Sequence, residues 1–392
     1  MFNTKIGLFV SGRKTVFKTL ANQISANDKV IWFHTASLGE YEQGLPVLEA
    51  LKKEYPDHTF LLTFFSPSGY EVKKDSGVAD IVTYLPLDTK ANAQKFLKLT
   101  HPELVIFVKY EFWPNYLAAL KKQNIHTISI STIFRSSQAF FRWYGGWMRK
   151  SLHAFYHIFV QDEASKKLLN DINYSNVTIS GDTRFDRVLE ILDRDNSLPF
   201  IETFKDNTPC IVIGSSWQED EAIFVPFINA STENCKYIIA PHNIKSQEIE
   251  KLKNRIHKPT VLFSEMEKQP DLSQFDVFIV DTIGILTKVY SYADIAYVGG
   301  GMGSTGLHNT LEPAVFGIPV VIGKHYSGFK EAEDLVQLGG VLSVTSEVEF
   351  KETTNRLLKD TDFKATTSKI NHDYVHANGN ASVIIMKYLS QR

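Results

Sequence analysis

One carboxylate, Glu40, follows the first apolar run of the chain at a position where two roles are open. The run Val30–Phe33 ends in a short polar turn, Thr35–Gly39, and leucines then recur at helical spacing, which predicts a strand, a turn and a helix. Ser37 and Glu40 stand three residues apart, so Glu40 could close a Ser-x-x-Glu capping box at the start of the helix. It could equally be an acid or base at the carboxyl end of a strand, where doubly wound folds bind ligands.

A second carboxylate, Glu111, follows another apolar run, Leu104–Val108, in the segment KYEFWPN. It could take part in chemistry at the same edge of a sheet, or it could belong to a buried structural ion pair. His34, at the end of the first apolar run, is interpreted as a hydrogen-bonded core residue.

The glycine-rich segment GGGMGSTGLHNTLEP, residues 299–313, is the strongest local feature of the chain. Its glycines permit close approach of the backbone to a ligand, and free amides at the following helix start favour an anion. Asn309 and Glu312 stand three residues apart, which fits a second capping box. The same residues could instead place a phosphate at the helix end and a nucleotide ribose on Glu312, with His308 as a helix-end or ribose contact.

Strands and helices must position these polar residues. Short β-branched and aromatic runs alternate with helical patterns in both halves of the chain, which predicts parallel sheets covered by helices on both faces. The strands are too many for one sheet, and a break follows Val177–Asp186, where the chain turns polar. We therefore expect an α/β protein with two Rossmann-like domains, residues 1–180 and 181–370, facing each other across a cleft. A helix within 371–392 is expected to pack back on the first domain.

The composition is that of a soluble globular protein. Of 392 residues, 43% are hydrophobic and 22% are charged, and no apolar run is long enough to span a bilayer. Cys210 and Cys235 have no partners at metal-binding spacing. This argues against a disulfide framework or a structural zinc site and favours a reducing compartment.

The chain through residue 178 carries a net positive charge, and the remainder carries a net negative charge. No acidic residue lies between Glu111 and Asp162, whereas cations are interleaved with aromatic residues around FFRWYGGWM, Phe140–Met148. Such a pattern suits an anionic membrane surface. A solvated basic face over an aromatic core is an equally open interpretation. We name Phe134–Lys150 the basic aromatic segment and take it as the candidate membrane contact.

Several motifs together resemble one enzyme family in their order and spacing. They are HTASLGE, FFSPSGYE, YLPLD, KYEFWPN, SGDTRFD, VDTIGIL and YVGGGMGSTGLHNTLEPAVFGIPVVIG, and the family is the 3-deoxy-D-manno-octulosonic acid (Kdo) transferases of lipopolysaccharide inner-core synthesis. The resemblance implies a GT-B glycosyltransferase that transfers Kdo from CMP-Kdo to a lipid A precursor, with inversion, at the cytoplasmic face of the inner membrane. We expect no cofactor and no nucleic acid partner.

The resemblance also assigns roles to individual positions. Glu40 becomes the general base, while Glu111 and Arg184 support the transition state. The substrate-binding positions are Ser66, Ser68, Gly69, Pro241, His242, Ile283, Gly284, Ile285, Asn309, Thr310, Leu311 and Glu312. A nucleotide leaving group needs no second carboxylic acid, because CMP departs as a stable anion whose charge a helix end and cations can meet. We therefore expect a metal-independent reaction.

Three positions depart from the family pattern: Arg184 replaces the usual lysine, His242 the usual arginine, and Ile285 the usual glutamate. The first keeps the charge with altered geometry, the second puts a phosphate contact in doubt, and the third suggests that the turn contributes backbone groups.

Two other functions remain open. A UDP-sugar transferase or 2-epimerase of the same architecture would share the two α/β domains and the glycine-rich turn. A non-catalytic membrane-surface protein would keep the basic aromatic segment, although the intact Glu40, Glu111 and Glu312 argue against it. The family commonly begins with an apolar N-terminal anchor. This chain starts just before LFVSGRKTVFKTL, so the anchor is expected to be either absent or truncated.

Overall fold

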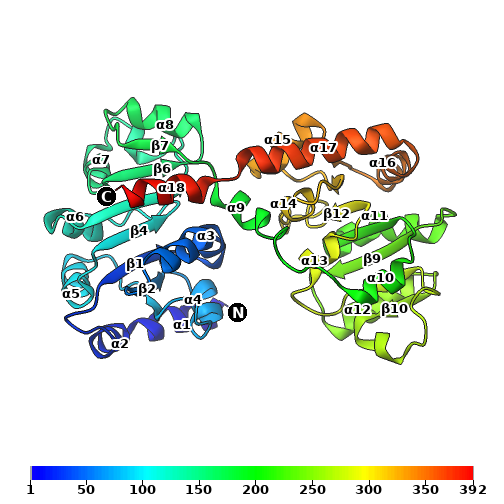
Figure 1. The fold of residues 1–392 in the computed structure, drawn as a ribbon, viewed down its shortest axis with the longest axis horizontal. Coiled ribbons are helices and arrows are strands. Elements are labelled where there is room, and N and C mark those ends of the chain that lie inside the picture. The colour runs from blue at the N-terminus through cyan, green and yellow to red at the C-terminus, as the bar shows by residue number, and fades with distance from the viewer. Residues whose placement is uncertain (1, 392) are drawn as a thin grey trace. The chain divides into compact units, whose positions relative to one another are not determined.

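The computed structural model describes residues 2–391, which form two compact units (Figure 1). Unit 1 extends to Arg187 and resumes at Asn378, and unit 2 comprises Val188–Ala377. The first boundary lies after Arg187, where the sequence pattern placed it after residue 180. The chain returns to unit 1 after Ala377, where the sequence pattern placed this change after residue 370.

Unit 1 is a seven-stranded parallel sheet with helices packed against it (Figure 1). Its strands are β1 (Val30–Thr35), β2 (Thr59–Phe64), β3 (Ile81–Tyr84), β4 (Leu104–Val108), β5 (His126–Thr132), β6 (His157–Val160) and β7 (Val177–Ile179). Its helices are α1 (Phe2–Arg13), α2 (Val16–Gln23), α3 (Leu38–Glu54), α4 (Pro67–Lys73), α5 (Lys90–Thr100), α6 (Pro114–Lys122), η1 (Ala139–Phe141), α7 (Gly146–Leu152), α8 (Glu163–Asn170) and α18 (Ala381–Ser390). Helix α9 (Thr183–Leu189) leads into unit 2.

The strand order of unit 1, β3-β2-β1-β4-β5-β6-β7, reverses direction between β1 and β4. Doubly wound sheets bind ligands outside the carboxyl ends of their strands at such a reversal. The turn after β1 leads to Glu40, and the segment after β4 carries Glu111. Both carboxylates therefore lie at the edge of the sheet where the fold favours a site.

Strand β1 shows why an unbroken apolar run occupies the centre of this sheet. All of its residues are buried, and their side chains alternate between two hydrophobic cores. Val30 and Trp32 belong to one core, whereas Ile31 and Phe33 belong to the other. A strand covered on both faces has no polar face to show in its sequence.

The C-terminal helix α18 packs on α3 within unit 1 (Figure 1). Ile385 and Leu389 join the same hydrophobic core as Leu45 of α3. The first turn of α18 is held by Asp186, whose carboxylate accepts hydrogen bonds from the Ala381 amide at 3.2 Å and from the Ser382 hydroxyl at 2.6 Å.

Unit 2 repeats the architecture with the order β10-β11-β9-β8-β12-β13-β14, which reverses between β8 and β12. Its strands are β8 (Cys210–Ser216), β9 (Lys236–Pro241), β10 (Thr260–Leu262), β11 (Val277–Ile279), β12 (Ile295–Val298), β13 (Val320–Ile322) and β14 (Val341–Ser343). Its helices are α10 (Pro199–Lys205), α11 (Gln218–Ala230), α12 (Ser246–Arg255), η2 (Phe263–Lys268), α13 (Leu286–Tyr290), α14 (Leu311–Ala314), α15 (Lys330–Leu338), α16 (Glu347–Lys359) and α17 (Thr361–Asn378).

The sequence pattern did not predict two of the strands, β7 and β14. Each is three residues long and lies at an edge of its sheet. In each of them only the first residue is buried, and a polar residue, Thr178 or Ser343, interrupts the apolar character, so the sequence shows no apolar run there.

Candidate active site

The carboxylate of Glu40 closes a capping box at the start of α3. Its Oε2 atom accepts the amide of Ala36 at 2.6 Å and that of Ser37 at 3.2 Å, while the Ser37 hydroxyl accepts the Glu40 amide at 3.5 Å. The capping interpretation is therefore correct as a description of the fold. It uses only Oε2 and leaves Oε1 outside the box, so it does not by itself exclude a chemical role.

The surroundings of Glu40 favour its protonated form. Burial of the half-buried side chain raises its pKa, and the negative charge of Glu111 raises it further. The Ala36 amide, His34 and Lys109 act in the opposite direction, but the net pKa is raised. A carboxylate of this kind is a stronger proton acceptor than an exposed one when it is ionised.

Glu111 ends a line of buried hydrogen bonds that begins inside the sheet. Its Oε2 atom lies 3.1 Å from Nε2 of His34 and accepts the indole N–H of Trp113 at 2.7 Å. The other ring nitrogen of His34, Nδ1, lies 2.8 Å from the Thr63 hydroxyl. The interpretation of His34 as a hydrogen-bonded core residue is confirmed, and the structure identifies Glu111 as one of its partners.

Arg184 is paired with Asp182, and both lie close to α3. Its guanidinium donates to Asp182 Oδ2 from Nε at 2.9 Å, while Gln43 of α3 donates to Asp182 Oδ1 at 2.6 Å. Thr183 also donates to the backbone carbonyl of Gln43. These bonds fix the segment that carries Arg184 one helical turn from Glu40.

Tyr110 lies among these charged groups. Burial raises its pKa, and Arg135, Glu40, Arg184 and Asp182 act on it electrostatically. Together with the bonds from Gln43 and Thr183, this indicates that Glu40 and Arg184 belong to the same edge of unit 1.

The backbone is constrained at the carboxyl ends of three strands. Lys109, Ser131 and Ser215 have positive φ angles of 67°, 50° and 54°, although none is glycine. Left-handed backbone at such residues costs free energy and persists where the surrounding structure imposes it, often at functional sites.

The positions Ser66, Ser68 and Gly69 lie at the start of α4, beside the turn that leads to Glu40. The Ser66 amide donates to the Ala36 carbonyl at 2.7 Å, and its hydroxyl caps α4 by accepting the Ser68 amide at 3.2 Å. A Cβ on Gly69 would lie 2.2 Å from the ring of Phe64. Only glycine therefore allows this close packing.

In unit 2 the glycine-rich loop follows β12 and is held by a buried carboxylate, Asp220 of α11. Its Oδ2 atom accepts the amides of Gly300 at 2.8 Å and Trp217 at 2.9 Å, and its Oδ1 atom accepts the Tyr297 hydroxyl at 2.7 Å. A Cβ on Gly299 would lie 2.4 Å from the Ser215 carbonyl. The loop can pass this close to β8 only because it lacks side chains there.

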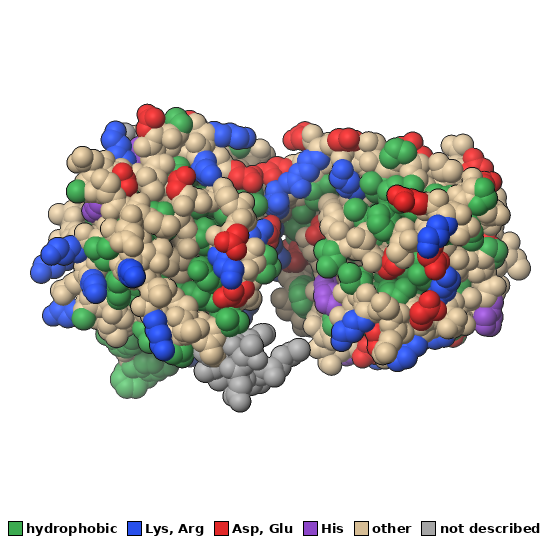
Figure 2. Space-filling model, turned by 90° about the horizontal axis from the view of Figure 1, so that it is seen from below, with side chains coloured by type: hydrophobic (Ala, Val, Ile, Leu, Met, Phe, Trp, Pro, Cys, Tyr) green, Lys and Arg blue, Asp and Glu red, His purple; other side chains and the backbone are tan. Residues whose placement is uncertain are grey.

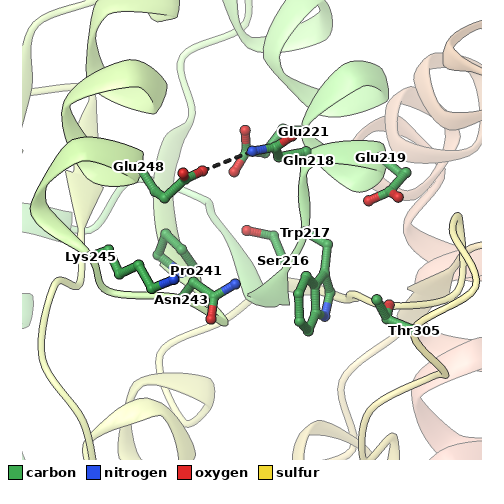
Figure 3. Close-up of a pocket in the computed structure, with 10 residues that line it drawn as sticks. All are labelled: Ser216, Trp217, Gln218, Glu219, Glu221, Pro241, Asn243, Lys245, Glu248 and Thr305. Carbon is green, nitrogen blue, oxygen red and sulfur yellow. Dashed lines mark hydrogen bonds between the residues drawn. The ribbon is translucent and has the colours of Figure 1, made fainter. Parts of the chain in front are cut away.

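A pocket of about 330 Å³ opens beside this loop, at the carboxyl ends of β8 and β9 (Figure 3). Its lining includes Ser216, Trp217, Pro241, Asn243 and Lys245. The Ser216 hydroxyl is buried, and no hydrogen-bond partner is present for it among the described residues. A buried hydroxyl without a partner is costly, so a polar ligand at this position would satisfy it.

His242 takes part in an aromatic stack next to the pocket. Its ring stacks on Trp217 with centroids 4.4 Å apart, and it lies 4.6 Å from the ring of His308. The Trp217 indole donates to Nε2 of His308 at 3.1 Å. Burial lowers the pKa of His308, and the neighbouring His242 lowers it further, so His308 is a hydrogen-bond acceptor at neutral pH.

The segment Asn309–Glu312 does not form the capping box that its spacing allowed. The Asn309 side chain accepts the Leu311 amide at 3.1 Å and donates to Glu312 Oε1 at 3.2 Å. The helix that follows, α14, is a single turn, so its dipole is small. The hydroxyl of Thr310 is buried, and within the described chain it has no partner.

The turn Ile283–Ile285 lies at the end of β11 and leads into α13. Ile283 is 81% exposed, Gly284 has a φ angle of 95°, and Ile285 precedes the helix. From α13, the Thr287 hydroxyl donates to Glu312 Oε2 at 3.3 Å. The structure therefore brings this turn next to the Asn309–Glu312 segment, although their motifs are separate in the sequence.

Two Asp-x-Asp triplets, a pattern that can hold a divalent ion, lie away from the strand ends just described. Asp195 bonds to Ser197 beyond α9, and Asp360 caps the start of α17. Among residues 2–391 no group of three or more His, Cys, Asp or Glu side chains is placed to hold a metal ion. Within the same residues, no helix combines the length and apolar character needed to cross a membrane.

Comparisons with known proteins identify the family. A family model described as 3-Deoxy-D-manno-octulosonic-acid transferase (kdotransferase) matches residues 11–187. The 3-deoxy-D-manno-octulosonic acid transferase of Aquifex aeolicus is 30% identical over 347 residues, which cover 82% of this chain and 88% of that protein. The protein of the same name from Haemophilus influenzae is 30% identical over 336 residues, or 82% and 77% of the two chains. The chain belongs to the Kdo transferase family.

Two solved structures have the same fold as this member of the Kdo transferase family. A UDP-GlcNAc 2-epimerase from Neisseria meningitidis, bound to UDP-GlcNAc, superimposes with a TM-score of 0.64 at 16% identity, covering 93% of this chain and all of its own. A second UDP-N-acetylglucosamine 2-epimerase gives 0.61 at 13% identity, over 93% and 98% of the chains. At such low identity the likeness concerns architecture alone, and it is GT-B, as the sequence predicted.

Sequence reasoning did not single out several residues that hold the candidate site together. Asp220 and Trp217 lie in the segment SSWQEDE, residues 215–221, and their position directly after an apolar run was the available signal. Gln43 and Asp182 form their bond across 139 residues of sequence, and no local pattern indicates such a pair.

Proposed function

We propose that this glycosyltransferase transfers Kdo from CMP-Kdo to a lipid A precursor with inversion, and that Glu40 is its general base. The observation that carries the proposal is the half-buried Glu40 carboxylate at the carboxyl end of β1, whose pKa is raised by burial and by Glu111. A sugar hydroxyl attacks the anomeric carbon of the donor, its proton passes to Glu40, and CMP leaves with the bonding electrons. Attack opposite the leaving group inverts the anomeric configuration.

Glu40 is suited to this step because the capping box fixes one of its oxygens. Oε2 is held by two amides, so Oε1 is presented in a defined direction without loss of side-chain freedom during the reaction. Glu111 and Arg184 complete the proposed site. The Arg184 guanidinium supplies positive charge, and Asp182 orients it through the bonds from Nε and Nη2.

The donor is proposed to bind unit 2 at the carboxyl ends of β8, β9 and β12. Three observations support this placement: the glycine-rich loop, the buried Ser216 and Thr310 hydroxyls, and the contact between Asn309 and Glu312. Lys245 and His242 are the nearby groups that can carry positive charge, and they suit a phosphate. Glu312 contacts Thr287 and Asn309, and as a carboxylate it can accept a hydrogen bond from a ribose hydroxyl.

A lipid acceptor requires contact with a membrane surface, and the basic aromatic segment is proposed to supply it. Trp143 is 91% exposed and Trp147 62% exposed, and cations accompany both. Figure 2 views unit 1 from the side of α1 and α2, and on that face Lys and Arg side chains are dispersed and form no single patch. Cations attract lipid phosphates, and tryptophan favours the interface, which fits a peripheral protein at the cytoplasmic face of the inner membrane.

The test is incubation with CMP-Kdo and a tetraacylated lipid A precursor, followed by mass spectrometry of the lipid. A mass increase by one or more Kdo residues in the parent, absent in Glu40→Gln, supports both substrate and base. The alternative of a UDP-sugar transferase or 2-epimerase would show itself as preferential binding of UDP over CMP. Absence of product with a correctly folded parent, together with liposome binding, would leave a non-catalytic membrane-surface protein.

A further inference from the structure

His34 lies inside the sheet of unit 1, yet its two ring nitrogens both meet polar partners. The residue is fully buried in β1, and its Cα is paired with that of Thr63 on the neighbouring β2. Its Nδ1 atom lies 2.8 Å from the Thr63 hydroxyl, and the same hydroxyl accepts the indole N–H of Trp32 at 2.8 Å. The three side chains therefore form a buried polar line on one face of the sheet.

The hydrogen-bond partners along this line favour one tautomer of His34, because the Glu111 carboxylate beside Nε2 can only accept when it is ionised. The Thr63 hydroxyl accepts from Trp32, whose indole can only donate, and has a single proton of its own to give. If that proton goes to Nδ1, the ring carries its proton on Nε2, where Glu111 Oε2 accepts it at 3.1 Å. The single N–H of Trp113 points to the same oxygen at 2.7 Å, a shorter distance than its 3.1 Å to His34.

We propose that His34 is a positioning residue for Kdo transfer. Its Nε2–H, directed by Thr63, holds the Glu111 carboxylate in a fixed orientation at the edge of the sheet where β1 and β4 end as neighbours and where Glu40 follows β1. This inference rests on the proposed function. It gives a role in the reaction to His34, which the sequence indicated only as a hydrogen-bonded core residue.

A structural role alone accounts poorly for this arrangement. A buried polar line is costly unless every member is satisfied, and an apolar side chain at His34 would fill the core without that cost. The line instead runs from Trp32 to the carboxyl edge of the sheet and ends on Glu111, one of the two carboxylates proposed for catalysis. The last hydrogen bond of this line, from His34 to Glu111, therefore sets the orientation of the Glu111 carboxylate.

Two substitutions separate the two ring nitrogens of His34. The amide of His34→Asn reaches the position of Nδ1 and keeps the contact with Thr63, whereas that of His34→Gln reaches the position of Nε2 and keeps a donor for Glu111. We expect His34→Asn to lower kcat on the order of 10- to 100-fold with an unchanged KM for the donor. His34→Gln should recover most of that loss. Circular dichroism and thermal unfolding verify that both variants fold.

A matched control is His157→Asn, because His157 on β6 also bonds a threonine hydroxyl of a neighbouring strand, Thr178 at 2.9 Å, but lies at the amino end of its strand. It should leave kcat within about twofold of the parent.

In a Glu111→Gln background, His34→Asn should have little further effect, because both act through one carboxylate. Equal kcat values for the parent and His34→Asn, or fully additive losses, would overturn the proposal.

A measurement independent of turnover separates this proposal from the proposed function. Long-range proton–nitrogen NMR spectra of the histidine rings should show the Nε2–H tautomer of His34 in the parent at neutral pH. Thr63→Val, which removes the hydroxyl at similar size, should abolish that preference. The Nδ1–H tautomer in the parent would overturn the inference whether or not Kdo is transferred. A parent with the Nε2–H tautomer but no Kdo transfer would overturn the reaction assigned here and, with it, the role of His34.

Discussion

At the scale of single residues, Glu40 combines a structural bond with a chemically useful environment. Its Oε2 atom caps α3 through two amides, which on their own would lower its pKa. Burial and Glu111 nevertheless raise that pKa, so desolvation outweighs the cap. The capping role and the proposed base role are therefore compatible. Glu40→Gln tests the base role, and Ser37→Ala tests the capping role.

Glu40→Gln should keep the fold and CMP binding while lowering kcat by roughly 100-fold or more, because the amide preserves shape and capping but cannot accept a proton. Ser37→Ala removes the other half of the capping box. It should lower the free energy of unfolding by about 1 kcal/mol and reduce kcat far less. Steady-state kinetics and thermal unfolding of both variants test this, and equal losses of turnover would leave Glu40 as a cap only.

The stability of Glu40→Gln relative to the parent should depend on pH. Since burial raises the folded pKa of Glu40 above its unfolded value of about 4.3, the parent gains stability from the protonated form at low pH and loses it as pH rises through the folded pKa. Glutamine does not titrate, so the variant should gain on the parent over that window. Urea unfolding at a series of pH values measures the difference. A difference that does not change with pH would contradict the raised pKa.

His242→Arg should strengthen donor binding. His242 stands where the family pattern has arginine, and its ring stacks on Trp217 beside the proposed phosphate position. A guanidinium can stack on the indole and bind a phosphate through two hydrogen bonds, so CMP affinity should rise several-fold, with a steeper salt dependence. Calorimetric titration with CMP at two salt concentrations tests this. His257→Arg is a control of equal charge outside the pocket. Equal gains in both variants would show that only net charge matters.

At the scale of elements, the basic aromatic segment contains both environments that its sequence allowed. Phe140 is buried and packs against Phe112 and Phe134, so part of the segment is an aromatic core. Trp143 and Trp147 are largely exposed beside that core. Large exposed tryptophans next to cations are typical of interaction surfaces.

Combined Arg142→Ala, Arg149→Ala and Lys150→Ala should weaken sedimentation with anionic liposomes and raise KM for the lipid acceptor without changing CMP affinity. Each cation near an anionic surface contributes about 1 kcal/mol, and added salt should screen the effect. The matched control replaces three exposed lysines of α5, Lys90, Lys95 and Lys98, and removes the same charge elsewhere on unit 1. Parent-like binding by the first variant at low salt would restrict the segment to a solvated face.

At the scale of the whole molecule, two doubly wound units each bring polar residues to the reversal point of a sheet. Unit 1 has its carboxylates after β1 and β4, and unit 2 has its glycine-rich loop and pocket after β8 and β12. This division fits an enzyme that places the base on one unit and the nucleotide donor on the other.

Activity should survive excess EDTA. The proposed reaction gives CMP a stable anionic leaving group, whose charge can be met by hydrogen-bond donors and cations of the chain. The measurement is Kdo transfer before and after EDTA treatment, with add-back of magnesium or manganese. Complete loss restored by either metal would contradict this prediction.

The sequence by itself determined the local units of this protein. Apolar runs covered on both faces indicated the central strands, and the Ser37–Glu40 spacing indicated the start of α3, because capping and burial act between near neighbours. The motifs also sufficed to identify the family. The edge strands β7 and β14 were not predictable, since each has a single buried residue and its sequence therefore holds no apolar run.

Only the tertiary structure decided which of these units meet. His34 reaches Glu111 across 77 residues of sequence, and Gln43 reaches Asp182 across 139. Strand order produces the first contact, because β1 and β4 are neighbours and their ends lie at one edge of the sheet. The second arises where the segment after β7 bonds to α3. The composition of a strand does not encode its neighbours, because parallel strands buried on both faces are all apolar and present the same backbone hydrogen bonds.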